Sequence, residues 1–291
     1  VEPLKPKVIV LFHWQKDVFS SLSDIAEVRF GPFKGDEFLK ELKDAVAIVL
    51  GASPMIDERF LERAPKLKIV ARFGVGYDNV DVEACTKRGV YVTHTPGVLS
   101  KAVADLTMGL ILSLSRKILE ADRHVRTAWA EGSAFPLGID LEDKVLGIIG
   151  LGRIGLAVAH RAKAFDMKVI YYDVIRKEDA EKSLGVQYVE LDDLLRSSDF
   201  VTIHVPLTSS TRKFISEREL RLMKRDAYLI NTSRGPVVDE DALRKALKKG
   251  WISGAGLDVF VKEPLPLNSP LLKLKNVVLT PHIGSATVET R

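Results

Sequence analysis

The sequence predicts an α/β protein with two parallel sheets, and three observations support this. Short apolar runs typical of strands alternate with helical segments along most of the 291 residues. The loops between them are short, which favours parallel strands crossed by helices. A long helical segment at 100–129 interrupts the alternation once. Because a chain of this length can form two domains, we expect one sheet before that segment and one after it.

The first part of the chain is expected to form a small domain, residues 1–95, with a flavodoxin-like parallel sheet. Asp57 is placed to cap one of its helices and Gly89 to end another. Strands are expected at 7–12, 25–30, 45–50, 67–72 and 90–93, and helices at 36–43, 57–63 and 82–88.

The segment 100–129 contains no Gly or Pro except Gly109 and is apolar in its middle. We expect one long helix or two. Asp105, Ser113 and Ser115 interrupt the apolar run, which argues against a membrane span. A helix buried between domains or subunits fits better, so we expect a homodimer and no membrane partner.

The second part of the chain repeats the alternation, and polar residues follow its strands. Strands are expected at 145–149, 168–172, 186–189, 199–204, 227–231, 253–258 and 277–280, and helices at 154–165, 191–196, 216–224 and 239–249. The polar residues at the strand ends are Asp173, His204, Asn231, Asp258 and His282. Ligands of open parallel sheets bind at the carboxyl ends of strands, so we expect these side chains to converge on one rim.

A glycine turn follows the strand at 145–149. Gly150, Gly152 and Gly155 have the G-x-G-x-x-G spacing. The first glycine allows a tight turn, the second lets a pyrophosphate approach the backbone, and the third lets the helix pack closely on the strand. The helix N-terminus then directs N–H groups and its positive dipole end toward the phosphates.

A structural turn is the alternative interpretation of such spacing, but the rest of the dinucleotide fingerprint is present. Asp173 ends the next strand about 20 residues after Gly152, where an acid binds the adenosine ribose. We therefore expect a Rossmann NAD-binding domain, residues 96–285, inserted after the smaller domain. A carboxylate at Asp173 should repel a 2′-phosphate, which favours NAD over NADP.

Composition excludes several other functions. The net charge of +4 is spread along the chain without runs of like charge, so nucleic acid is not an expected partner. Cys85 is the only cysteine, which rules out an intrachain disulfide and fits the cytoplasm. No metal site is expected.

Hydride transfer to a nicotinamide cofactor needs an acid/base group and a cation for an anionic substrate. The candidates are His282, Glu263 and Arg234, all in predicted loops. Taken alone, each is as readily a surface, turn or solvated loop residue.

Several motifs in order along the chain give these residues a context. They are Arg72-Phe-Gly-Val-Gly-Tyr-Asp-Asn79, His94-Thr-Pro-Gly-Val-Leu-Ser100, the glycine turn, His204-Val-Pro-Leu-Thr208, Asn231-Thr-Ser-Arg-Gly235, Gly256-Leu-Asp-Val-Phe260 and Pro281-His-Ile-Gly-Ser285. Together they resemble the D-isomer-specific 2-hydroxyacid dehydrogenases over nearly the whole chain. Within that family the chain is most similar to the glyoxylate/hydroxypyruvate reductase branch.

The resemblance implies the catalytic and substrate roles. His282 would be the general acid in reduction and the base in the reverse direction. Glu263 would orient His282 and favour its protonated form. Arg234 would bind the substrate carboxylate and carbonyl. The remaining substrate-binding residues would be Arg72, Gly74, Val75 and Gly76.

The resemblance also implies the cofactor-binding residues, with Asp258 holding the nicotinamide amide. They are Gly150, Leu151, Gly152, Arg153, Ile154, Gly155, Asp173, His204, Val205, Pro206, Thr211, Thr232, Ser233, Asp258 and Gly284.

Two alternatives to reduction of glyoxylate or hydroxypyruvate stay open. The first keeps the mechanism but acts on another acid, as D-3-phosphoglycerate dehydrogenase or another D-2-hydroxyacid dehydrogenase. The second is a non-enzymatic NAD-sensing scaffold, like the corepressors related to this family. Turnover of any 2-oxo acid with NADH separates the enzymes from the scaffold.

The chain departs from the family pattern in two places. Members generally carry a further helical segment after the last motif, whereas this chain stops at Arg291, so we expect that segment to be cut or missing. Residues 286–291 could complete the first domain. His94 stands where many relatives have Asn, and the sequence offers no physical account of its effect.

Overall fold

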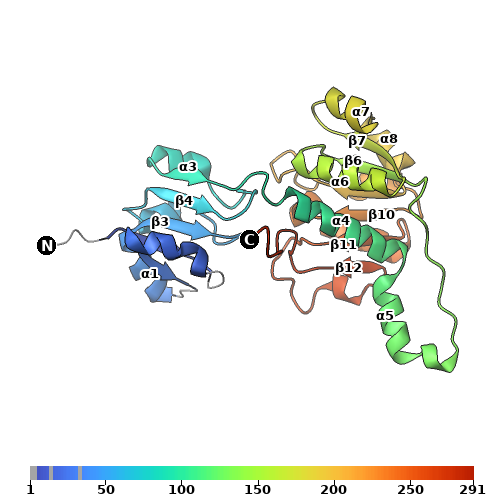
Figure 1. The fold of residues 1–291 in the computed structure, drawn as a ribbon, viewed down its shortest axis with the longest axis horizontal. Helices are drawn as coiled ribbons and strands as arrows, with labels where there is room; N and C mark the ends of the chain where they lie inside the picture. The colour runs from blue at the N-terminus through green and yellow to red at the C-terminus, as the bar shows by residue number, and fades with distance from the viewer. Residues whose placement is uncertain (1–4, 13–15, 32–34) are drawn as a thin grey trace. The chain divides into compact units, whose positions relative to one another are not determined.

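A computed structural model describes residues 5–12, 16–31 and 35–291. The chain divides into two compact units, Val1–Val98 and Leu99–Arg291, called here the first and second units (Figure 1). The last six residues therefore group with the second unit.

The first unit is built on a five-stranded sheet in which every pair is parallel. Its strands are β1 (Lys7–Val10), β2 (Glu27–Phe30), β3 (Ala45–Leu50), β4 (Ile69–Arg72) and β5 (Tyr91–Thr93). They lie in the order β2-β1-β3-β4-β5. This 2-1-3-4-5 order is that of flavodoxin-like folds, and it confirms the predicted class.

The helices described in the first unit are η1 (Lys16–Asp24), α1 (Gly35–Asp44), α2 (Glu58–Arg63) and α3 (Val82–Lys87). Two of them, α2 and α3, begin at an aspartate that caps them. Asp57 accepts a hydrogen bond of 2.9 Å from the Phe60 N–H at the start of α2. The sequence did not predict η1, a 3-10 helix that buries no side chain.

The second unit contains a seven-stranded, wholly parallel sheet. Its strands are β6 (Val145–Ile149), β7 (Lys168–Tyr172), β8 (Gln187–Tyr188), β9 (Phe200–Ile203), β10 (Tyr228–Asn231), β11 (Gly254–Leu257) and β12 (Val277–Leu279). They follow the order β12-β11-β10-β9-β6-β7-β8. The chain direction across the sheet reverses between β6 and β9, which is the position where doubly wound folds bind their ligands.

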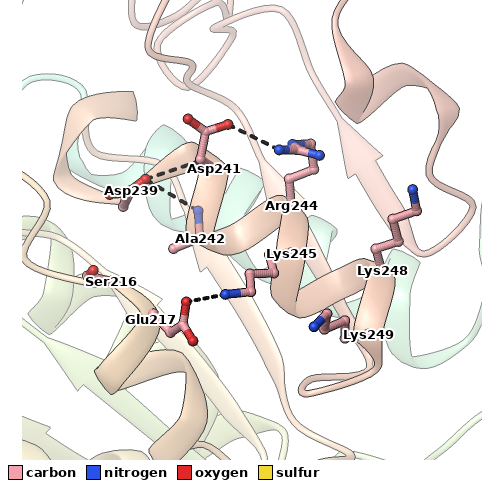
Figure 2. A pocket seen from close by; sticks show the side chains of 9 residues that line it. All are labelled: Ser216, Glu217, Asp239, Asp241, Ala242, Arg244, Lys245, Lys248 and Lys249. Carbon is pink, nitrogen blue, oxygen red and sulfur yellow. Dashed lines mark hydrogen bonds and ion pairs between the residues drawn. The ribbon is translucent and has the colours of Figure 1, made fainter.

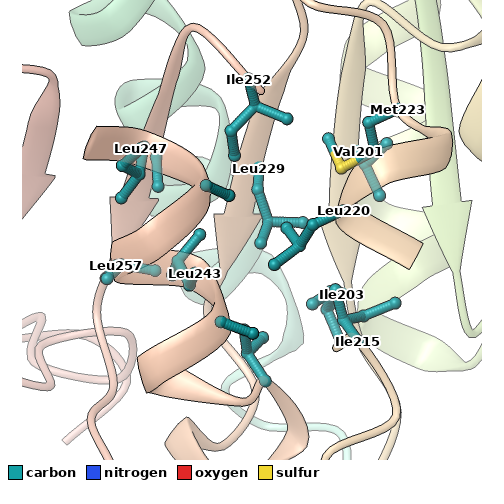
Figure 3. Packing of buried hydrophobic residues seen from close by; sticks show 14 of the residues in the cluster. Val201, Ile203, Ile215, Leu220, Met223, Leu229, Leu243, Leu247, Ile252 and Leu257 are labelled. Atoms are coloured by element: carbon teal, nitrogen blue, oxygen red, sulfur yellow. The ribbon is translucent and has the colours of Figure 1, made fainter. Parts of the chain in front are cut away.

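Helices cover both faces of this sheet. The helices of the second unit are α4 (Ser100–Ser115), α5 (Ile118–Thr127), η2 (Trp129–Glu131), α6 (Arg153–Ala164), α7 (Glu178–Leu184), α8 (Leu191–Ser197), α9 (Glu217–Leu222), η3 (Gly235–Val237), α10 (Glu240–Lys249) and η4 (Pro270–Lys273). Side chains of α4 and α6 share one core with the sheet, and those of α8, α9 and α10 share the other. Figure 3 shows the second core, where Leu243 and Leu247 of α10 pack beside Leu229 of β10.

The predicted segment 100–129 is divided between α4 and α5. Lys117 adopts a left-handed φ of 53° between them, so the first helix ends and a new one starts. None of the residues of α5 is buried, and Figure 1 shows this helix extending beyond the sheet. Among the described residues, no helix is long and apolar enough to cross a membrane.

Candidate active site

The parallel register brings the carboxyl ends of five neighbouring strands to one rim. Asn231 pairs with Leu257 on one side and Ile203 on the other, and Ile203 pairs with Ile149. The residues that directly follow these strands therefore lie along the same edge of the sheet. They are Gly150, His204, Thr232, Asp258 and Thr280.

The three glycines of the turn after β6 meet different surroundings. A Cβ on Gly150, whose φ is +92°, would meet the backbone of His204, and one on Gly155 would meet the carbonyl oxygen of Gly150. A Cβ on Gly152 would enter open space. The turn is thus closely packed at Gly150 and Gly155. It is open at Gly152, just before the α6 N-terminus, where a pyrophosphate would approach. This arrangement fits a dinucleotide.

Asp173 directly follows β7 and connects that strand to the glycine turn. One carboxylate oxygen accepts the Leu151 N–H at 2.8 Å, and the other accepts the Ile175 N–H at 3.2 Å. These bonds fix the carboxylate beside the turn, where the fingerprint places the ribose acid.

His204 follows β9 and packs against the glycine turn. Its Nε2 lies 3.0 Å from the Thr202 hydroxyl, while its buried Nδ1 has no hydrogen-bond partner among the described residues. Burial lowers the pKa of His204 to about 3, so the ring is neutral at physiological pH. Beyond it, the Pro206 carbonyl accepts a 2.6 Å hydrogen bond from the Thr211 hydroxyl. The predicted residues His204, Val205, Pro206 and Thr211 thus lie in one loop, which this hydrogen bond stabilises.

The turn after β10 is held by Asn231, which the sequence motif contained but which was not assigned a role. Its side-chain oxygen accepts the N–H and hydroxyl of Ser233 at 3.0 and 2.9 Å, and its amide donates to the Arg234 carbonyl at 3.0 Å. Thr232 bonds to the buried Thr107 of α4 at 3.0 Å. This framework fixes the backbone from which Arg234 extends.

Glu263 and His282 form a direct pair. His282 Nδ1 lies 2.6 Å from Glu263 Oε2, and the Phe260 N–H donates to Glu263 Oε1 at 2.9 Å. About a third of each side chain is exposed. Burial raises the pKa of Glu263, but the hydrogen bonds from His282 and Phe260 and the charges of His282 and Arg234 outweigh it and hold the pKa below its ordinary value. Glu263 and His282 are therefore in direct contact, and Arg234 acts on Glu263 through its charge.

Asp258 organises the turn that carries His282. Its Oδ1 accepts the Thr280 hydroxyl at 2.6 Å and the Ile283 N–H at 2.8 Å, and its Oδ2 accepts the Gly284 N–H at 2.9 Å. Burial raises the pKa of Asp258 despite these bonds. His282 itself has a left-handed φ of 54°, an unusual conformation for a residue with a side chain. The Asp258 carboxylate stabilises this turn, a role the sequence did not suggest.

The first unit carries the other predicted substrate-binding residues, directly after β4. Arg72 is 7% exposed, and its guanidinium donates to the Phe73 carbonyl and, at 3.3 Å, to Asn79 Oδ1. The glycine loop of Gly74, Val75 and Gly76 follows it.

A surface pocket of about 440 Å³ beside α10 does not include any candidate site residue (Figure 2). Lys245 pairs with Glu217 at 2.7 Å, and Arg244 pairs with Asp241 at 3.4 Å. The pocket is a charged surface hollow lined by acidic and basic side chains, two pairs of which bond to one another. Within the described residues, no cluster of His, Cys, Asp or Glu has the form of a metal site.

Comparison with known proteins identifies the family. Residues 108–284 match the NAD-binding domain of the D-isomer specific 2-hydroxyacid dehydrogenases. The chain belongs to the D-isomer specific 2-hydroxyacid dehydrogenase family. This dehydrogenase is 50% identical to a glyoxylate reductase from Korarchaeum cryptofilum, over 99% of this chain and 89% of the relative.

Solved structures agree with this assignment. A D-lactate dehydrogenase from Aquifex aeolicus, complexed with NAD and lactic acid, matches with a TM-score of 0.87 and 34% identity, covering 98% of this chain and 90% of its own. An NADPH-dependent glyoxylate/hydroxypyruvate reductase from Sinorhizobium meliloti matches with a TM-score of 0.86 and 36% identity, covering 98% and 89%. The chain is a nicotinamide-dependent dehydrogenase of small 2-hydroxy acids.

Proposed function

We propose that this dehydrogenase reduces glyoxylate and hydroxypyruvate with NADH, forming the D-isomer where the product is chiral. The observation that carries the proposal is the 2.6 Å pair of Glu263 and His282 on the rim of the second unit, where the charge of Arg234 also acts on Glu263. The 50% identity to a glyoxylate reductase supports the choice of substrate.

The dinucleotide is proposed to lie along the carboxyl rim of the seven-stranded sheet, in a cofactor domain of residues 96–285. When bound, its nicotinamide supplies the hydride. The residues that would hold it are Gly150 to Gly155, Asp173, His204, Val205, Pro206, Thr211, Thr232, Ser233, Asp258 and Gly284.

His282 is proposed to donate the proton. Its Nδ1 is bonded to Glu263, which leaves Nε2 to protonate the substrate's carbonyl oxygen as hydride arrives on carbon. The lowered pKa keeps Glu263 ionised near neutral pH, so its carboxylate stabilises the imidazolium and fixes the ring. In the reverse direction neutral His282 takes the hydroxyl proton.

Substrate binding is proposed for Arg234 and for the glycine loop after β4. Arg234 would bind the carboxylate and carbonyl oxygens with its planar guanidinium. The smaller domain, residues 1–95, would add backbone N–H groups of Gly74, Val75 and Gly76, next to Arg72. A panel of 2-oxo acids assayed with NADH and NADPH tests the substrate and the cofactor together. If the chain binds NADH but turns over none of these acids, the proposed enzymatic function is refuted.

A preference for NADH over NADPH is proposed from the loop after β7. The Asp173 carboxylate would meet the ribose hydroxyls and repel a 2′-phosphate. The nearby Arg176 is engaged by Glu181 through bonds of 2.8 and 2.7 Å, which raise the pKa of Arg176 and hold its guanidinium on α7. A higher kcat/KM with NADPH than with NADH would contradict the preference.

A homodimer is proposed from the exposed apolar side chains of α5 and the segment after it. Ile118, Leu119, Val125 and Trp129 are each between 47% and 64% exposed. Apolar side chains concentrated on a projecting helix are typical of association surfaces. Sedimentation should give the mass of a dimer at micromolar concentration, and a monomer would contradict this.

A further inference from the structure

The loop after β4 has three successive carbonyl groups, each of which accepts a hydrogen bond. The Phe73 carbonyl accepts from the Arg72 guanidinium. The Gly74 carbonyl accepts from the Thr95 N–H at 3.0 Å. The Val75 carbonyl lies 2.9 Å from His94 Nδ1, which must carry the proton because a carbonyl only accepts. The donors come from β4 and from the segment after β5.

These bonds set the direction of three N–H groups. In a planar trans peptide, the N–H points away from the carbonyl of the same peptide. Holding the carbonyls of 73, 74 and 75 therefore directs the N–H groups of Gly74, Val75 and Gly76 away from their respective donors. The described residues provide no acceptor for these three N–H groups. Successive free N–H groups of this kind form an anion-binding nest.

Glycine at 74 is required by the same arrangement. Its φ of +144° favours glycine, and a Cβ there would collide with the Arg72 guanidinium. The loop backbone thus lies directly over the buried arginine.

The two side-chain donors are themselves fixed. Arg72 Nε donates to Asn79 Oδ1, and Asn79 Nδ2 in turn donates to the carbonyls of Gly51 and Pro54 at 3.2 and 3.0 Å. The His94 ring packs edge-on against Tyr77, with ring centroids 5.3 Å apart.

We infer that Arg72 and His94 are positioning residues, which hold the 73–76 loop in the conformation that binds the substrate carboxylate. The inference rests on the proposed function of that loop. It gives Arg72 an indirect role, since its guanidinium bonds to the loop from beneath. It also gives His94 a role, which the sequence left without explanation.

Variants at His94 test the inference most cleanly, because this side chain is exposed and its loss should leave the fold intact. His94→Leu removes the donor and keeps bulk. His94→Asn keeps an N–H donor at a position close to Nδ1. Tyr91→Ala, on an exposed residue of β5, is the matched control.

The readouts are KM and kcat for glyoxylate, the inhibition constant of oxalate and the Kd of NADH. Loss of one hydrogen bond to the loop should raise KM and the oxalate constant roughly 3- to 10-fold in His94→Leu. The kcat and the Kd of NADH should change less than twofold. His94→Asn should recover most of the lost affinity, and Tyr91→Ala should resemble the wild type.

Arg72→Met provides a second test, with thermal unfolding to confirm that the variant folds. It should raise both constants by more than His94→Leu, without changing the pH profile of kcat. If the wild type is active and folded His94→Leu has an unchanged KM and an unchanged inhibition constant for oxalate, the inference is overturned but the proposed function is not. A wild type that neither turns over a 2-oxo acid nor binds oxalate would refute the proposed function as well.

Discussion

Two glycine segments follow parallel strands of this molecule, and they expose backbone N–H groups by different means. The turn after β6 leads into α6, so the free N–H groups of a helix N-terminus would supply its proposed anion site. The loop after β4 leads into no such helix. Its N–H groups are directed by hydrogen bonds from Arg72, Thr95 and His94 to the carbonyls.

The difference shows what a short motif can encode. The spacing of Gly150, Gly152 and Gly155 is sufficient for the first site, because the helix that completes it follows at once. The second site depends on the segment after β5, some twenty residues further along the chain. Its conformation is therefore a tertiary property.

The largest predicted effect is on the rate of the chemical step, in a variant that leaves both glycine segments unchanged. His282→Ala should lower kcat by about 10²- to 10⁴-fold, the usual contribution of a positioned general acid. The Kd values of NADH and oxalate should change far less, because neither glycine segment is altered. Steady-state kinetics with hydroxypyruvate measures this, and His160→Ala, on the exposed face of α6, is the control. A near-normal kcat would remove His282 from the mechanism.

Within the turn after β6, Gly152→Ala and Gly155→Ala should behave in opposite ways. Alanine at 152 enters open space, so stability should hold while the Kd of NADH rises roughly thirtyfold from crowding of the pyrophosphate. Alanine at 155 meets the Gly150 carbonyl and should cost about 1–3 kcal/mol of unfolding free energy. Calorimetry and urea unfolding separate the two. Equal stability losses would mean that Gly152 is also packed against protein.

His204 should make the second unit sensitive to acid. Its pKa is about 3 in the folded chain and 6.5 as an ordinary value, so the unfolded state takes up the proton first as pH falls. Stability from the neutral ring is complete above pH 6.5 and declines toward pH 3. The loss is about 1.4 kcal/mol for each pH unit within that range. His204→Gln should flatten the urea-unfolding curve against pH over this range. An unchanged slope would place the acid sensitivity elsewhere.

The smallest effect concerns the loop after β4. Gly74→Ala should raise KM for glyoxylate about tenfold and leave the Kd of NADH unchanged, because its left-handed φ and contact with Arg72 both disfavour a Cβ. Kinetics with glyoxylate and titration with NADH measure the two constants. A parallel change in the Kd of NADH would mean that the two glycine segments are not independent.

Much of the fold could be predicted from the sequence because its signals are local. Asp57 caps α2 as expected, and Gly89, which was expected to end a helix, lies just after α3 with a left-handed φ of 68°. The break at Lys117 was left open, since a left-handed lysine has no local sequence signature. The α7 helix was not predicted either: it is short, acidic in its first turn and buries only Ala180.

The site shows the same division. Asp173, His204, Asp258 and His282 were predicted to share a rim because each follows a strand in the sequence. The alternation of strands and helices predicts that these strands are parallel, so their carboxyl ends meet at one edge. The bonds from Thr280 and Gly284 to Asp258 join segments more than twenty residues apart. No periodicity encodes which polar atoms meet across such a separation, so the supporting roles of Asp258 and Asn231 required the structure.

The most direct test of the proposed reaction is to incubate the wild-type chain with NADH and hydroxypyruvate and determine the configuration of the product. We predict NADH consumption in equal amount to glycerate formed, with glycerate of the D configuration. NADH that stays unoxidised with both hydroxypyruvate and glyoxylate, or glycerate of the L configuration, would contradict the proposal.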